Sequence, residues 1–140
     1  MSKLRQRLRD ASRSGVYRVT RADAIDEAVR GTKLNIARVD LNAAATKDAV
    51  LQRIAKALAF PDWFGGNWDA LEDCLIDLSW REAEGHVLVF TGAPPGDDLG
   101  VLIDVLASSA QFWAARGRPF FAVFVGAQDH LGLALLHREG

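Results

Sequence analysis

The sequence contains a single cysteine, Cys74, among its 140 residues. One cysteine excludes a disulfide within the chain and favours a reducing compartment. No apolar run approaches the ~18 residues that are needed to span a bilayer. The amino-terminal residues also lack the apolar core of a secretory signal. Together these absences predict a soluble, cytoplasmic protein.

Histidine is scarce as well, and His86, His130 and His137 are scattered along the chain. They form no metal-ligand spacing, and no serine nucleophile or glycine-rich phosphate loop lies at a recognisable distance from the acidic residues described below. We therefore expect no catalytic residues, no metal and no cofactor. A carboxylate hydrolase stays open as an alternative, with Asp69 and Asp73 as paired acid and base.

A formal net charge of −1 conceals two segments of opposite charge. Residues 1–21 hold one acid, Asp10, and many bases: Lys3, Arg5, Arg7, Arg9, Arg13, Arg18 and Arg21. Residues 60–84 hold one base, Arg81, and many acids: Asp62, Asp69, Glu72, Asp73, Asp77, Glu82 and Glu84. Each segment creates a local field that favours a partner of opposite charge.

Hydrophobic periodicity predicts strands that alternate with helices. The expected strands are 16–19, 34–41, 87–90 and 120–125, and the expected helices are 22–30, the stretch between Thr46 and Pro61, the stretch from Asn67 to near Trp80, and 97–116. Two of these strands are unbroken apolar runs, which is typical of parallel strands buried on both faces. The sequence therefore predicts an α/β fold with a small, three- to four-stranded parallel sheet packed by helices.

The expected domain organisation is simple. Residues 15–140 are predicted to form one domain, because no repeat or linker interrupts them. Residues 1–14 are basic and polar, and we expect a poorly ordered arm there. From Ala127 onward we expect a loop or a short helix.

Residues 60–80 form the most informative segment, FPDWFGGNWDALEDCLIDLSW. On a helical wheel, the residues within about 60° of Asp69 are Glu72, Asp73, Ile76 and Trp80. The opposite side is apolar and holds Leu71, Cys74, Leu75 and Leu78. One face is therefore expected to pack in the core, and the other to present carboxylates to a positively charged partner.

This segment resembles the recognition segment of the barstar family, small intracellular inhibitors of barnase-type ribonucleases. The resemblance rests on Pro61, Trp63 and Phe64, followed from Gly65 by the pattern Gly-x-Asn-x-Asp-Ala-Leu-x-Asp-Cys-Leu. The order of predicted elements after Lys33 is compatible with the family, whose fold is a three-stranded parallel sheet packed by helices. The additional strand near Tyr17 exceeds that compact core and could add an edge strand.

The resemblance also implies roles for individual residues. Asp73 would enter the pocket where substrate phosphate sits, Asp69 would pair with a second arginine, and Trp63 would cover the mouth of the active site. Carboxylates can occupy such a cleft because they accept charge-assisted hydrogen bonds from arginine. The other predicted partner-binding residues are Gly65, Gly66, Asn67, Glu72, Ile76, Asp77 and Trp80.

Several of these residues also have a predicted structural task. Gly65 and Gly66 allow close approach of backbone, and Asn67 is a suitable helix N-cap. Two interpretations stay open for Trp80, an exposed interface anchor or an indole folded back onto the core. Cys74 is expected to be structural, because acids surround it and apolar residues lie beneath it.

Two positions depart from the family pattern. The position after Leu71 is an interfacial aromatic in the best-known family member, whereas this chain has Glu72. That member also uses an acid late in its last helix, a place that falls near Phe112 here, and no acid lies between Val105 and Arg116. We therefore expect a cognate ribonuclease with a shape different from that of barnase.

The predicted function is intracellular inhibition of a barnase-type ribonuclease by occlusion of its active site. One alternative is a barstar-fold binding or immunity module for another basic toxin or protein. A second alternative is a nucleic-acid-binding protein that uses the basic residues 1–14. Nucleic acid is the less favoured partner, and no membrane partner is expected.

Overall fold

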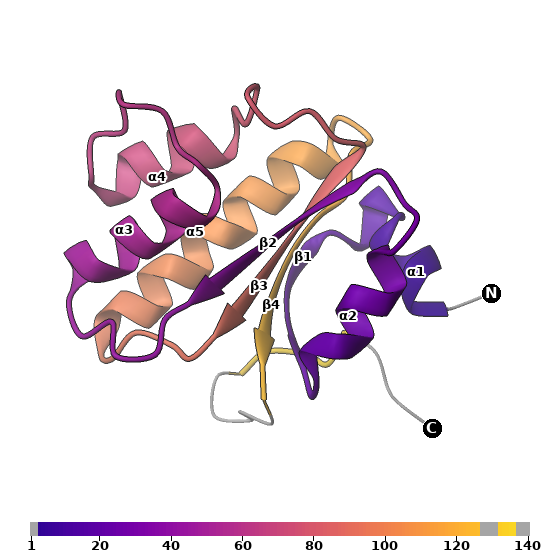
Figure 1. The fold of residues 1–140 in the computed structure, drawn as a ribbon, viewed down its shortest axis with the longest axis horizontal. Coiled ribbons are helices and arrows are strands. Elements are labelled where there is room, and N and C mark those ends of the chain that lie inside the picture. Colours follow the sequence, from indigo (N-terminus) through magenta and orange to yellow (C-terminus); the bar gives the residue numbers. More distant parts are fainter. Residues whose placement is uncertain (1–2, 127–131, 137–140) are drawn as a thin grey trace.

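A four-stranded parallel sheet forms the centre of the computed structural model, which describes residues 3–126 and 132–136 (Figure 1). The strands are β1 (Gly15–Val19), β2 (Leu34–Asp40), β3 (Gly85–Thr91) and β4 (Phe120–Val125). Their order across the sheet is β1-β4-β3-β2. The predicted α/β fold with a small parallel sheet is confirmed, and β1 is the additional edge strand.

The two central strands separate two hydrophobic layers, because successive side chains of a strand point to opposite faces. In β4, Phe120, Ala122 and Phe124 pack in the larger cluster, whereas Phe121 and Val123 pack in the smaller one. All five of these side chains are buried. This burial on both faces explains why β3 and β4 have unbroken apolar sequences.

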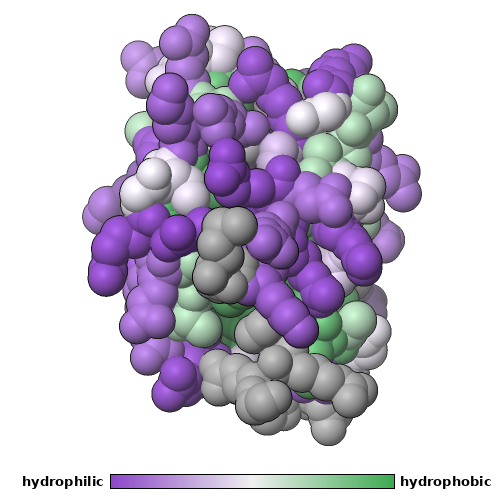
Figure 2. Space-filling model, turned by 90° about the vertical axis from the view of Figure 1, so that its right-hand side faces the viewer, coloured by the Kyte–Doolittle hydropathy of each residue, from purple (hydrophilic) through white to green (hydrophobic). Residues whose placement is uncertain are grey.

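Three helices cover the face with the larger cluster: α3 (Lys47–Ala57), α4 (Trp68–Leu75) and α5 (Asp97–Ala114) (Figure 1). Two helices, α1 (Lys3–Leu8) and α2 (Ala22–Val29), cover the other face. The outward side of this second layer is mostly hydrophilic in Figure 2, as expected for a layer that faces solvent. Among the described residues, no helix has the length and apolarity to cross a membrane.

The amino-terminal segment differs from the prediction of a poorly ordered arm over residues 1–14. Within its described part, α1 packs in the smaller hydrophobic cluster and is followed by a 3₁₀ turn (Ala11–Arg13). Leu4 and Leu8 lie one helical turn apart and are buried, and the Arg5 Nε donates to the Ala28 carbonyl at 3.0 Å. Burial of two leucines anchors the segment, because each contributes roughly 2 kcal/mol of hydrophobic free energy.

The carboxyl-terminal segment meets the edge strand. Leu135 forms a parallel bridge with Arg18, and Leu136 is buried in the smaller cluster. Most of the loop or short helix expected from Ala127 onward lies outside the described residues.

Helix α4 ends earlier than the sequence predicts, at Leu75 instead of near Trp80. Its last turn tightens when the Asp77 N–H bonds the Cys74 carbonyl at 3.2 Å. Leu78 then adopts a left-handed backbone with φ of 47°, which ends the helix and buries the Leu78 side chain. Ile76 and Asp77 therefore lie in the turn after α4, and Trp80 lies beyond it.

Candidate protein-binding site

The start of α4 is fixed by its own sequence. Asn67 caps the helix, as predicted, because its side-chain oxygen accepts from the Ala70 N–H at 2.7 Å. Gly66, immediately before it, has a φ of 71°, a conformation that costs residues with a Cβ atom about 1–2 kcal/mol. This cap and glycine set the angle at which the loop from Pro61 enters the helix.

The outer face of α4 is acidic, and its carboxylates are unpaired within the described part of the chain. Asp69 and Asp73 are exposed and stand one helical turn apart, and Glu72 between them is half-buried. Asp77 is exposed in the following turn, next to the half-buried Ile76. These side chains form no hydrogen bond or ion pair with other described residues. Their charges are therefore available to an external partner.

The inner face of α4 packs in the core, as predicted. Leu71, Cys74 and Leu75 are fully buried. Burial, together with the smaller effect of the neighbouring charges of Asp73 and Asp77, raises the pKa of the Cys74 thiol to about 11. The thiol is thus protonated at neutral pH, and Cys74 is a packing residue with no nucleophilic character.

An exposed tryptophan adjoins the acidic face. The Trp63 side chain is 58% exposed, and no other large hydrophobic side chain in the described residues is exposed. It lies in the loop between α3 and α4, the same loop that carries Gly65 and Gly66. A large ring left in water next to unpaired carboxylates is typical of a protein-binding surface, where aromatic side chains act as anchors.

Three further aromatic rings hold this loop. Phe60 meets Phe64 edge-on with ring centroids 5.0 Å apart, and Trp80 meets Phe60 and Trp63 at 6.0 and 6.1 Å. The Trp80 indole N–H donates to the Leu58 carbonyl at 3.0 Å. Of the two interpretations of Trp80, the structure favours the folded-back indole, which is half-buried against the core.

Trp113 on α5 is a supporting residue that the sequence analysis missed. Its indole N–H donates to the Leu75 carbonyl at 2.8 Å, so it satisfies an otherwise open carbonyl at the end of α4. No local pattern marks this residue, because its partner is distant in sequence. The carboxyl-terminal part of α5 therefore supports the acidic helix directly.

The carboxyl-terminal end of α5 has no acid at the place where the best-known family member is expected to have one. Phe112 is half-buried near the end of α5, and the Arg116 guanidinium lies over its ring, 3.5 Å from the centroid. Arg116 also donates to the Phe112 carbonyl at 2.9 Å. This corner thus combines an aromatic ring with a positive charge, in keeping with the sequence departure at Phe112.

The acidic face of α4 offers two neighbouring carboxylates to a partner. Within residues 3–126 and 132–136, no group of three His, Cys, Asp or Glu side chains is placed to hold a metal ion. The two carboxylates of Asp69 and Asp73 stand on an exposed helix face. A protein surface with matching arginines or lysines could pair with both at once.

Comparison with known proteins gives one family. A family model described as Barstar (barnase inhibitor) matches residues 34–125. The match spans strands β2 to β4 and helices α3 to α5, and it includes the whole of the loop and helix described above. No curated protein sequence matches the chain.

Proposed function

Because this chain belongs to the barstar family, we propose that it binds a barnase-type ribonuclease and occludes its active site. The observation that carries this proposal is the pair of exposed, unpaired carboxylates of Asp69 and Asp73 beside the exposed ring of Trp63. A ribonuclease must present cationic side chains to hold substrate phosphate, and the acidic face of α4 has the complementary charge.

The mechanism is electrostatic and steric. Asp73, at the centre of the exposed face, takes the place of the substrate phosphate, and Asp69 pairs with a second cation one turn away. Trp63 covers the mouth of the cleft and excludes water, which strengthens the charged hydrogen bonds inside. This mechanism requires no turnover. We propose that the protein acts in the cytoplasm as an inhibitor that protects the cell producing it.

Rigidity of the binding surface supports tight binding. Asn67 and Gly66 fix the start of α4, Trp113 fixes its end, and Trp80 holds the loop that carries Trp63. Side chains that are already in place lose less conformational entropy on association. The backbone and the aromatic rings of this surface therefore have little conformational entropy left to lose when a partner binds.

A second candidate partner is another basic toxin or protein bound by the same face. The observation that favours it is the corner formed by Phe112 and Arg116, where the best-known family member is expected to have an acid. A cation at this rim disfavours a partner that is basic around its whole cleft. The acidic centre with a cationic rim instead fits a partner whose positive charge is concentrated in the cleft itself.

The proposal is tested by titrating the protein into a barnase-type ribonuclease assay. Occlusion of the active site predicts inhibition that is complete at a 1:1 ratio and competitive with substrate. Absence of inhibition with a folded protein would reject a barnase-type target. Capture of a different basic protein that is lost in Asp73→Ala would then support the second candidate.

A further inference from the structure

The turn that follows α4, residues 76–81, carries part of the surface that is proposed to bind a partner. Asp77 is exposed in this turn, and Trp80 near its end meets the exposed ring of Trp63 with ring centroids 6.1 Å apart. The position of the turn therefore sets where these side chains stand relative to the acidic face of α4.

Side chains from distant elements hold both ends of the turn. At its beginning, the Trp113 indole N–H of α5 donates to the Leu75 carbonyl at 2.8 Å. At its end, the Arg81 Nη2 donates to the side-chain oxygen of Asn35 on β2 at 2.8 Å. The buried ring of His86 on β3 contacts both anchors: its centroid lies 5.6 Å from that of Trp113, and its Nδ1 lies 3.2 Å from the Asn35 side-chain nitrogen. His86 thus links the two ends of the turn through the core.

The hydrogen bonds between Arg81, Asn35 and His86 allow only one arrangement of protons. A guanidinium donates and never accepts, so the oxygen of the Asn35 amide must face Arg81. The amide nitrogen then faces His86 and donates, so the Nδ1 of the ring must accept. The proton of the neutral ring therefore lies on Nε2. Arg81 fixes the tautomer of His86 through Asn35.

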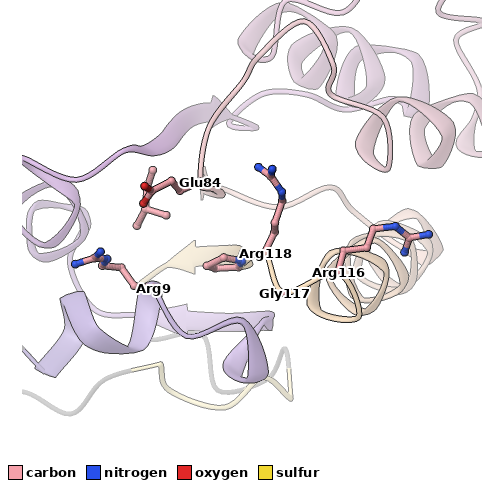
Figure 3. A pocket seen from close by; sticks show the side chains of 7 residues that line it. Arg9, Glu84, Arg116, Gly117 and Arg118 are labelled. Atoms are coloured by element: carbon pink, nitrogen blue, oxygen red, sulfur yellow. The ribbon is translucent and has the colours of Figure 1, made fainter.

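Two charged groups act on the His86 ring, and both are cationic. They are Arg81 and Arg118, whose Nη1 donates to the Ala83 carbonyl at 2.7 Å. Glu84 lies across the adjoining cavity from Arg118 in Figure 3, and it forms no ion pair with other described residues. The contacts from β2 and α5 are an amide and an indole, which do not titrate. Burial, together with the two cations, lowers the pKa of His86 to about 4, so the ring is neutral at pH 7.

A proton on Nδ1 would break this arrangement. The protonated nitrogen only donates, and the Asn35 nitrogen that faces it donates as well. If the Asn35 amide turned its oxygen toward His86, its nitrogen would face the Arg81 guanidinium, which accepts nothing. In both cases one hydrogen bond of the anchor is lost. A buried polar network stabilises its surroundings only when all of its members are satisfied.

We propose, on the basis of the function proposed above, that neutral His86 positions the turn after α4 for partner binding through Asn35 and Arg81. His86 is buried and Asn35 is half-buried, so both act on the partner only through the turn. Replacing Asn35 leaves the carboxylates of α4 in place but releases one end of the turn that carries Asp77.

The first test is the tautomer of His86 in the free protein at pH 7, read from the ¹⁵N chemical shifts of its ring nitrogens. The wild-type ring is expected to carry its proton on Nε2. Asn35→Asp presents carboxylate oxygens to both Arg81 and His86, so Nδ1 should carry a proton in that variant. A wild-type proton on Nδ1, or an unchanged ring in Asn35→Asp, would overturn the proposal.

The second test is amide hydrogen exchange of residues 76–81 in Asn35→Leu, which removes both side-chain hydrogen bonds. Exchange in the turn should quicken by at least about tenfold relative to the amides of β4, which report global unfolding. Asn42→Leu, a change at an exposed position just after β2, is the matched control and should leave exchange in the turn unchanged. Equal acceleration of the turn and of β4 in Asn35→Leu would show a general loss of stability and reject a positioning role.

Affinity for a barnase-type ribonuclease is measured separately. Asn35→Leu should weaken binding by about three- to tenfold, and Asn42→Leu should bind as the wild type does. Unchanged affinity of Asn35→Leu for a ribonuclease that the wild type binds would overturn the positioning role. Absence of binding by the wild type would reject the proposed function, whereas the tautomer and the exchange rates, both measured without a partner, would still decide how the turn is held.

Discussion

Trp80 meets Trp63 edge-on, with ring centroids 6.1 Å apart, although the whole of α4 separates the two residues in the chain. The Trp63 ring is exposed, whereas Trp80 is half-buried and hydrogen-bonded to the Leu58 carbonyl. Trp80 therefore connects the exposed ring to the end of α3. This contact turns an otherwise irregular loop into a defined surface.

Trp80→Phe is expected to weaken partner binding by about three- to tenfold, because it removes the hydrogen bond and part of the ring contact, together worth about 1 kcal/mol. Trp63→Ala removes the exposed ring itself and should weaken binding more. Dissociation rates measured on immobilised partner give both values, with circular dichroism as the check on folding. Equal dissociation rates for wild type and Trp80→Phe would show that Trp80 does not position Trp63.

The two adjacent glycines of the same loop are expected to respond differently to alanine. Gly66→Ala should lower the free energy of unfolding by about 1 kcal/mol, because φ at this position is 71°. Gly65→Ala is the matched control, since a Cβ there would lie 3.4 Å from the Ala70 Cβ, which is ordinary contact. Urea denaturation measures both values, and equal losses for the two variants would contradict the role given to Gly66.

His86 makes the stability of the fold dependent on pH. Its Nδ1 lies 3.2 Å from the side-chain nitrogen of Asn35, which donates to the neutral ring, and its pKa is lowered from 6.5 to about 4. The unfolded chain therefore binds the proton first. The stability due to neutral His86 is complete above pH 6.5 and is lost as the pH falls from 6.5 toward 4, by up to about 3 kcal/mol.

The measurement is the free energy of unfolding in urea at pH 7 and at pH 4.5 for wild type and His86→Gln. The variant lacks the titrating ring, so its stability should fall less between the two pH values than that of the wild type. Parallel losses in both proteins would assign the acid sensitivity to other groups.

The corner formed by Phe112 and Arg116 is expected to control partner choice. Replacing both residues, with Phe112→Glu and Arg116→Ala, should tighten binding to a barnase-type ribonuclease by about two- to tenfold, because it exchanges a cation for an acid at an exposed rim. Arg116→Ala alone is the control, because it measures the part of the effect that comes from removing the repulsion between Arg116 and a cationic partner. Association rates at low salt should show the effect most clearly, and slower association of the double variant would contradict this assignment.

Much of the fold could be predicted from local sequence. The runs 87–90 and 120–125 are apolar without interruption, and Asn67 and Thr46 are good N-caps that the structure confirms with bonds to Ala70 and Ala49. These features depend on residues close to one another in the chain. Local physics is sufficient for them.

Features that depend on distant contacts could not be predicted in this way. The helical pattern of carboxylates continues past Leu75, yet α4 ends there. Leu78 turns into the core with a left-handed backbone, and the Trp113 indole N–H donates to the Leu75 carbonyl. At the amino terminus, the many arginines give the segment a polar composition, so the sequence does not predict that Leu4 and Leu8 pack in a core. Both leucines are buried only because the sheet layer is there to cover them.

Asp73 is the residue on which the proposed function depends most. The direct test is the inhibition constant toward a barnase-type ribonuclease for wild type and Asp73→Asn, with Asp104→Asn, an exposed acid on α5, as the matched control. We predict a loss of at least about 100-fold, or about 3 kcal/mol, for Asp73→Asn, because it leaves a buried cation of the partner unpaired. Asp104→Asn should inhibit as the wild type does. Equal inhibition by wild type and Asp73→Asn would contradict the account.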